Sequence, residues 1–380
     1  MKSNIINLRT KSTLATMAFL LLLFSCKKNN TGPSVSSNIL NYQIKEIPVT
    51  QDYIVGSFYY NFGSFNANIK EVPVVGKYAM PGGVETPNVM PQHITQAQTA
   101  GLDYFVFSFR SANKDATNWK NDSTLVQTFL AANTTATPMK FALQYNWSTG
   151  SYAVSNTAPL ESNATKLNQF FNDIQLAATN WMSSPNYMKV NGKMLLYIQN
   201  AQVLYSNNNV AIYDTLRSRL SAMGFTMYIV GMQDRWTPPA RYPFRYVKCV
   251  DAIYHQSFST QLDSWDRWYV LPQAMDQNWE YSRNYFADSM GGISYVPNIS
   301  PAYNWLITSP TSLNPNYPRT DSGAMYRQLC NVAKMNADNS TRLIMIDSWN
   351  SWQDDSQLEA AIDYQNRYLN ITKQEFKKTQ

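Results

Sequence analysis

Carboxylate side chains gather near the end of the chain, beside two tryptophans. Residues 344–361 read IMIDSWNSWQDDSQLEAA and contain Asp347, Asp354, Asp355 and Glu359. Two carboxyl groups flanking one glycosidic bond can hydrolyse it, because one protonates the leaving oxygen and the other acts as base or nucleophile. We therefore consider Asp354 as a candidate acid, with Asp347 or the more distant Asp234 as its partner.

A structural role for some of these acids stays open. We expect a helix over 354–370, and the first turn of a helix favours acids for its dipole alone. Asp355 could serve as an acid or simply begin this helix. Glu359 is expected to be structural, on the first turns of the same helix.

Strands and helices alternate along the chain. We expect helices over 90–101, 121–133 (with Asp122 as N-cap), 161–182, 209–224, 269–291, 320–337 and 354–370. We expect strands over 53–60, 102–109, 139–147, 193–199, 225–233, 249–258, 292–300 and 342–349. The strands are nearly continuous apolar runs, as in parallel sheets buried on both faces. The pattern predicts an α/β protein with a single (β/α)₈ TIM-type barrel over 51–375; an open doubly wound sheet is the alternative.

In such a barrel the chemistry lies at the carboxyl ends of the strands, and here those ends are polar and aromatic. Rings can stack on the apolar faces of sugars while amides bind hydroxyl groups. Ordinary loop polarity explains each residue equally well on its own, so the convergence of all the ends carries the prediction. The candidate sugar-binding residues are Tyr59, Tyr60, Gln144, Asn146, Trp147, Gln199, Trp236, His255, Tyr303, Trp305, Asn350 and Trp352.

Five of these aromatic residues should line one groove if the sugar hypothesis holds. They are Tyr60, Trp147, Trp236, Trp305 and Trp352. A protein without a ligand would instead have a filled barrel mouth.

The N-terminus is typical of a bacterial lipoprotein signal. Residues 1–25 combine basic residues with an apolar stretch too short to span a bilayer, and LLFSC ends at Cys26. We expect Cys26 to be lipidated and residues 26–50 to form a flexible tether. An ordinary signal peptide with a chance cysteine is the alternative. The expected location is the bacterial cell envelope, on either membrane face.

Charge and composition limit the classes of ligand that the protein is expected to bind. The chain carries a net charge of +6, which falls to +3 when the three basic residues of the signal segment are removed. So mild and dispersed a charge does not favour nucleic acid. The sequence has no phosphate-binding glycine loop, no paired metal ligands and no need for a cofactor. An oligo- or polysaccharide is the expected partner, and the oligomeric state is left open. Cys249 and Cys330 can pair or remain free thiols.

The last strand resembles the signature of family 99 glycoside hydrolases, the endo-α-mannosidases and endo-α-mannanases, and of related barrels from polysaccharide loci. That signature reads approximately W-N-E-W-x-E-G-x-x-L/I-E-P, and this chain has WNSWQDDSQLEA at 349–360. Similar fragments occur in the same order elsewhere: GSFYYNF, ITQAQTAGLDYFVFSF, YMKVNGKMLLYI and VPNISPAYNW. The resemblance therefore covers most of the chain after Gln51.

The resemblance implies a catalytic pair that is altered here. In the family, the first glutamate of E-W-x-E takes the proton of the substrate's 2-hydroxyl, and the second is the general acid and base. Ser351 and Asp354 occupy these positions, and a serine cannot replace a carboxylate base unaided. Two hypotheses follow: a divergent glycoside hydrolase acting on an α-linked, mannan-like glycan, or a non-catalytic glycan-binding lipoprotein that keeps the cleft.

Overall fold

The computed structural model describes residues 42–62, 69–84, 86–134, 137–256, 270–311, 316–319 and 321–378. The predicted signal segment and Cys26 lie outside these described residues. Residues Ile44–Gln380 form a compact unit. This unit begins before the predicted boundary at residue 51, because the Ile47 backbone binds the side chains of Asn331 and Lys334 (2.6 and 2.7 Å).

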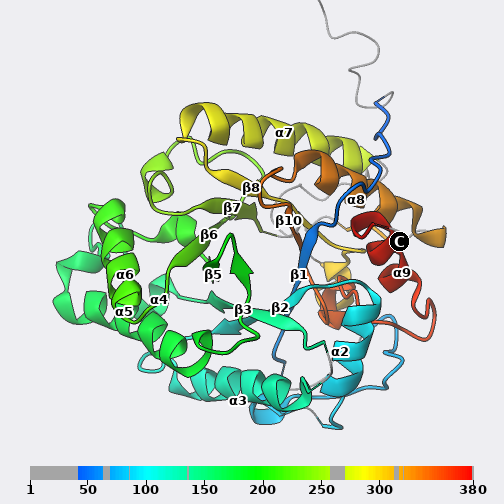
Figure 1. Ribbon diagram of the computed structural model, residues 1–380, viewed down its shortest axis with the longest axis horizontal. Helices are drawn as coiled ribbons and strands as arrows, with labels where there is room; N and C mark the ends of the chain where they lie inside the picture. Colours follow the sequence, from blue (N-terminus) through cyan, green and yellow to red (C-terminus); the bar gives the residue numbers. More distant parts are fainter. Residues whose placement is uncertain are drawn as a thin grey trace, which may run out of the picture. The chain divides into compact units, whose positions relative to one another are not determined.

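Parallel strands form a nearly closed ring, as predicted (Figure 1). The strands are β1 (Ile54–Tyr59), β2 (Tyr104–Phe109), β3 (Lys140–Tyr145), β4 (Lys189–Val190), β5 (Lys193–Ile198), β6 (Met227–Gln233), β7 (Ala252–His255), β8 (Ser294–Val296), β9 (Asn298–Ile299) and β10 (Leu343–Ile346). Their order is β8-β7-β6-β5-β3-β2-β1-β10-β9, and the short β4 pairs antiparallel with β5. Because β8 and β9 are consecutive pieces of one stretch, the ring has the architecture of a (β/α)₈ barrel.

Helices surround the ring on the outside (Figure 1). They are α2 (Met90–Thr99), α3 (Ala116–Ala132), the short α4 (Thr149–Tyr152), α5 (Ala164–Ala177), α6 (Asn209–Ala222), α7 (Leu271–Ser289), α8 (Ala324–Asn336) and α9 (Arg367–Phe376). The predicted helices and strands correspond to these elements, except that the helices predicted over 121–133 and 354–370 begin at other residues. No helix among the described residues is long and apolar enough to cross a membrane.

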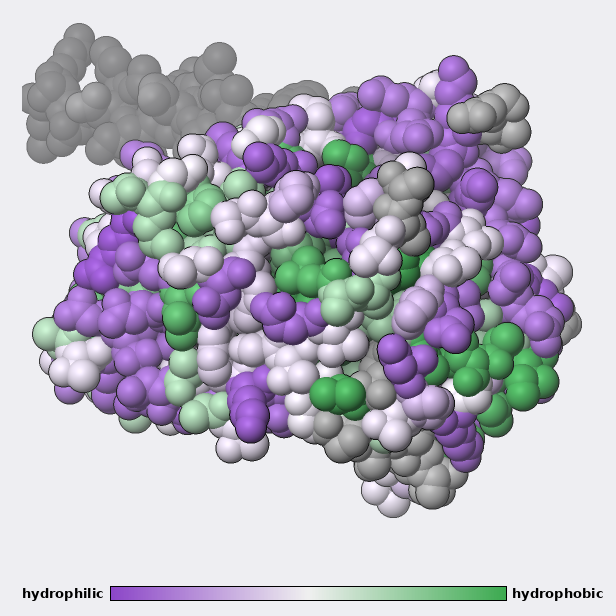
Figure 2. All heavy atoms as spheres, turned by 60° about the horizontal axis from the view of Figure 1, so that its bottom comes forward, coloured by the Kyte–Doolittle hydropathy of each residue, from purple (hydrophilic) through white to green (hydrophobic). Residues whose placement is uncertain are grey.

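Side chains alternate between two apolar cores along each strand. On β1, Phe58 packs inside the barrel while Val55 and Tyr59 face the helices. On β10, Leu343 and Met345 point inside, and their neighbours point outward. This is the period-two geometry of a strand, and it decides which residues just beyond each strand face the barrel mouth. Figure 2 shows that one outer face is mostly hydrophilic, with small separate hydrophobic patches.

The predicted helix over 354–370 is wrong. A short 3₁₀ turn covers Trp352–Asp354, and α9 begins only at Arg367. The backbone between them bonds to a distant segment: Ala360 O accepts from Val74 N–H (2.9 Å), and Ile362 N–H donates to Val72 O (2.8 Å). These long-range bonds replace the ladder that a helix would need.

The predicted N-cap at Asp122 is also wrong. Helix α3 begins at Ala116, so Asp122 lies inside it. Its carboxylate is buried and accepts hydrogen bonds from Arg110 rather than from its own helix end.

Candidate functional site

A polar cavity of about 240 Å³ lies at the carboxyl ends of the strands. Its position is the one where (β/α)₈ barrels carry their chemistry. It is lined by Phe58, Tyr59, Tyr60, Asn61, Ser108, Arg110, Asp122, Leu125, Gln144, Asn146, Gln199, Met232, Tyr254, Gln256 and Asp347.

Six predicted site residues meet in this cavity: Tyr59, Tyr60, Gln144, Asn146, Gln199 and Asp347. Strand alternation explains five of them. Tyr60 lies two residues after Phe58, which points into the barrel, and Asp347 lies two residues after Met345, which also points inward. Gln144, Asn146 and Gln199 continue inward rows in the same way. Tyr59 is the exception, since its hydroxyl turns outward to His93 Nδ1 on α2 (2.7 Å).

The predicted aromatic groove is wrong for most of its members. Trp147 and Trp352 are buried, and Trp236 packs in the helix-facing core against Trp279 of α7. Trp147 lies two residues after Tyr145, which points toward the helices, so Trp147 also points outward and packs on Phe170 of α5. Only Tyr60, which is 37% exposed, lines the cavity.

Four other predicted sugar-binding residues lie outside the cavity lining, as do the predicted catalytic residues Ser351, Asp354 and Asp234. His255 faces the helices, where its Nδ1 is 3.0 Å from the Tyr295 hydroxyl; burial lowers its pKa to about 3, so it is neutral. Tyr303 is buried, and its backbone pairs with Tyr317. Trp305 begins a partly buried 3₁₀ turn. Asn350 is buried, and its side-chain amide binds both backbone groups of Tyr60 (2.8 and 3.0 Å), which holds that residue at the mouth.

Asp347 is a carboxylate at the cavity wall. It is only 7% exposed, and the Tyr60 hydroxyl donates a hydrogen bond to its Oδ1 (2.8 Å). Burial and then the Asp347 charge raise the pKa of Tyr60 well above its usual value, so Tyr60 stays a neutral donor. The same two causes, in that order, raise the pKa of Tyr254 on the facing part of the wall.

Asp354 lies close to Asp347. Its Oδ1 accepts from the backbone N–H and hydroxyl of Ser356 (3.2 and 2.7 Å), and Ser351 also forms a hydrogen bond with it. Burial raises the pKa of Asp354 to about 6, opposed by these hydrogen bonds and supported by the Asp347 charge. The tertiary structure therefore brings Ser351, Asp354 and Asp347 together, and Asp354 is partly protonated near neutral pH.

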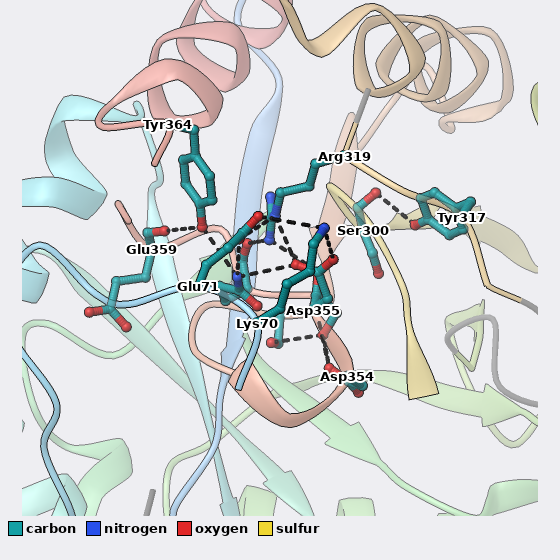
Figure 3. Close-up of polar contacts among 12 residues, drawn as sticks. Lys70, Glu71, Ser300, Tyr317, Arg319, Asp354, Asp355, Glu359 and Tyr364 are labelled. Carbon is teal, nitrogen blue, oxygen red and sulfur yellow. Dashed lines mark hydrogen bonds and ion pairs between the residues drawn. The ribbon is translucent and has the colours of Figure 1, made fainter. Parts of the chain in front are cut away.

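The next residue, Asp355, has a different environment. It is buried, lies 3.0 Å from the Arg319 guanidinium and adopts a positive φ of 59° (Figure 3). Glycine adopts this conformation most readily and aspartate tolerates it, which fits the glycine of the family signature at this position. Asp355 is thus a structural ion-pair partner rather than a catalytic acid.

Glu359 is structural, as predicted, though it lies in a loop rather than a helix. It is buried and accepts hydrogen bonds from the Tyr78 hydroxyl (2.7 Å) and Trp352 Nε1 (2.9 Å). His93 Nε2 lies 3.0 Å from its other oxygen. This network holds the loop that carries Ser351 and Asp354 against Tyr78 and His93.

Asp234 follows β6 and does not contribute to the cavity lining. It lies near Tyr242 and Tyr246, where its charge helps to raise the pKa of both, after burial. Asp347 is therefore the better placed partner for Asp354. Cys249 and Cys330 are buried free thiols. Within the described ranges, no group of three or more acidic, histidine or cysteine side chains is arranged to hold a metal ion.

Several residues that line the cavity were not among those predicted from the sequence. Ser108, Tyr254 and Gln256 continue the inward rows of their strands, so alternation could have found them. Arg110 and Asp122 form an ion pair at the cavity edge (2.6 Å), and only tertiary packing brings helix α3 to it.

Comparison with known proteins agrees with this geometry. No protein-family model and no curated protein matches the sequence. Two structures of the GH99 endo-α-mannosidase from Bacteroides thetaiotaomicron, one in complex with BIS-TRIS-propane, match at 16% identity with TM-scores of 0.57 and 0.56, covering 85% of this chain and 95% and 96% of theirs. A solved glycoside hydrolase-like protein matches with a TM-score of 0.79 and 30% identity, over 90% of this chain and 98% of its own. The chain therefore belongs to the family of that glycoside hydrolase-like protein, and its fold is GH99-like.

Proposed function

We propose that the protein is a divergent glycoside hydrolase that cleaves an α-linked, mannan-like glycan. The observation that carries the proposal is the pair of interacting carboxyl groups at the barrel mouth, Asp347 at the cavity wall and Asp354 beside it. Glycoside hydrolysis needs two such groups at one bond, and the second glutamate of the family signature corresponds to Asp354.

Asp354 has the properties of a general acid. With a pKa of about 6, roughly a tenth of its carboxyl groups carries a proton at pH 7 and about half do so at pH 6. A proton donor is most effective when its pKa is close to the working pH. Within the part of the chain that the structure describes, no ion pair neutralises Asp354, so it can donate its proton to the leaving oxygen and recover it from water.

Asp347 takes the place of the missing base. Tyr60 orients its carboxylate by donating to Oδ1 (2.8 Å). The serine at the family's first glutamate position forms a hydrogen bond with Asp354 and cannot accept a proton as a carboxylate does. The substitution of glutamate by Ser351 thus moves the second carboxyl role to a residue four positions earlier in the chain.

Most of the aromatic residues expected to bind a sugar are packed in the core, so the proposal of a sugar ligand rests on the polar cavity lining and on the glycoside hydrolase-like relative. Asparagine, glutamine, serine and tyrosine side chains converge there with the Arg110–Asp122 ion pair. Such groups bind hydroxyls in a fixed orientation. The GH99 endo-α-mannosidases that share the fold support α-mannosides as the proposed substrate class.

A non-catalytic glycan-binding protein is the second candidate function. Ser351 favours it, because the loss of the family's base would leave a cavity that binds sugar without cleaving it. Turnover separates the two functions directly.

The test is product analysis on a panel of α-mannans and α-glucans. We expect slow release of reducing ends by the wild type and a loss of roughly 10²–10⁴-fold in Asp347→Asn. If Asp234→Asn has this effect and Asp347→Asn does not, the partner assignment is wrong. Glycan affinity without turnover in the wild type would establish the binding function instead.

The location of this activity is a second part of the proposal. Cys26 and its preceding LLFS motif support a lipid tether that holds the barrel at the bacterial cell envelope. Cys26→Ala should move the protein from the membrane fraction to the soluble fraction. A variant that still sediments with membranes after a salt wash would refute the tether.

A further inference from the structure

Arg319 is a buried cation on a segment remote in sequence from the candidate acid. Its Nε lies 3.0 Å from Asp355 Oδ1 and 3.2 Å from Glu71 Oε2, and its side chain is 4% exposed. Lys70 approaches the other Asp355 oxygen (3.3 Å) from the protein surface. Figure 3 shows Arg319 between Glu71 and Asp355, with Asp354 just beyond them.

The guanidinium also binds the backbone of the acid-bearing loop. Arg319 Nη2 donates to the carbonyl oxygens of Asp355 (3.1 Å) and Gln357. These carbonyls lie one and three residues beyond Asp354. The Arg319 Cζ atom is 4.6 Å from the ring centre of Tyr364 and 4.7 Å from that of Tyr368. A planar fork held by two rings leaves the loop little freedom to move.

This loop turns directly after the candidate acid. Asp355 takes its positive φ there, and the turn places the Ser356 N–H and hydroxyl against the Asp354 carboxylate. Both hydrogen bonds stabilise the ionised form of Asp354 and so oppose the effect of burial on its pKa. The position of the Ser356 donors therefore depends on the turn that Arg319 holds.

A buried ion network is not needed merely to stabilise a loop. Apolar side chains of similar size often stabilise a fold as well as buried ion pairs do, because charges lose hydration on burial. What a forked cation adds is direction, since Nε and Nη2 contact two carboxylates and two backbone carbonyls at once.

We propose that Arg319 is the positioning residue of the acid: its guanidinium fixes the Asp355–Gln357 turn and thereby holds the Asp354 carboxyl beside Asp347, which lines the cavity. The inference rests on the proposed function, in which Asp354 is the acid. Arg319 itself does not touch the substrate.

Arg319→Lys is the first test, because it keeps the buried positive charge but loses the fork. We expect kcat to fall roughly 10–100-fold with little change in KM, as a slightly misplaced catalytic group would cause. The pKa of Asp354 should rise above that of the wild type, because the Ser356 donors shift. Carboxyl ¹³C NMR of the full protein, with Asp354→Asn to assign the signal, measures this pKa.

A second variant guards against misfolding. Glu71→Gln combined with Arg319→Gln removes one charge of each sign, so it leaves no unbalanced charge beyond the Lys70–Asp355 pair. Arg327→Lys is the matched control, since Arg327 on α8 also pairs with a glutamate, Glu375 (3.1 Å). We expect the double variant to shift both kcat and the pKa of Asp354, and the control to shift neither.

Two outcomes decide the inference. If Arg319→Lys and the double variant fold with the wild-type pKa at Asp354, Arg319 only stabilises the loop and the inference is overturned. If no protein, including the wild type, cleaves a glycan, the proposed hydrolase function fails. A shifted Asp354 pKa would then still support the positioning role, because that readout is independent of turnover.

Discussion

Two consecutive aspartates on the loop after β10 have opposite environments. Asp355 is buried among Arg319, Lys70 and Glu71, and it takes part in ion pairs of 3.0 and 3.3 Å. Asp354 lies near Asp347, and its carboxylate forms hydrogen bonds with the serines at 351 and 356. The paired carboxylate supports the fold, whereas the carboxylate with a raised pKa has the properties that chemistry requires.

The difference shows that the role of each acid in one short motif depends on its surroundings in the folded protein. Both residues belong to the same short motif, and both are acids. A carboxylate that forms ion pairs with buried or nearby cations, as Asp355 does, is held in place by them. One that is half-buried beside another carboxylate retains its proton to higher pH. The contrast between Asp354 and Asp355 predicts measurable differences of decreasing size in turnover, stability and pH dependence.

The largest contrast is in turnover. Asp354→Asn should reduce glycan hydrolysis by roughly 10²–10⁴-fold, because an amide cannot donate a proton to the leaving oxygen. The measurement is initial rates of reducing-end release on the α-mannan panel. High turnover that survives this substitution would place the acid elsewhere.

The second contrast is in stability. Asp355→Asn should lower the free energy of unfolding by roughly 3–5 kcal/mol, because it leaves Arg319 buried with an incomplete set of partners. Urea unfolding measures the loss, and the exposed Asp288→Asn on α7 is the control, with an expected change within about 0.5 kcal/mol. Equal stability of the two variants would contradict the structural role of Asp355.

The third contrast is in pH dependence. The folded-state pKa of Asp354, about 6, exceeds its ordinary value of 3.8, so the folded protein binds this proton more tightly than the unfolded chain does. The stabilising contribution of the bound proton is complete below pH 3.8 and is lost as the pH rises through 6. Asp354→Asn should therefore be more stable than the wild type at pH 8, by roughly 1–3 kcal/mol.

Urea unfolding of this variant and the wild type at pH 4 and pH 8 tests the sign. The difference between the two proteins should nearly vanish at the lower pH. A wild type that is the more stable protein at pH 8 would mean that Asp354 is compensated, like Asp355.

The smallest expected effect is a gain of function. Ser351→Glu restores the first glutamate of the family signature and should raise turnover by roughly tenfold, less than a well-placed base provides because Asp347 already occupies the neighbourhood. The matched substitution Ser356→Glu should not raise turnover, since it removes a hydrogen bond to Asp354. No gain in Ser351→Glu would show that Asp347 fully performs the second role.

The positions of the strands along the chain could be predicted from the local sequence pattern. Continuous apolar runs such as 104–109 and 343–346 mark buried parallel strands wherever they occur, because each must bury both faces. The family motif similarly located Ser351 and Asp354. Alternation within each strand could also have separated inward Tyr254 from outward His255, since that geometry is local.

Apolar periodicity is a local property, so the barrel and the position of its mouth could be predicted from the amino-acid sequence. The remaining features depend on contacts that form only when the chain folds. The stretch after Asp354 carries helix-forming residues, but its backbone bonds to segments hundreds of residues away. Arg319 and Glu71 are likewise remote in sequence from Asp355, and they meet it because the barrel closes. The pKa of a carboxyl depends on burial and neighbouring charge, and folding sets both.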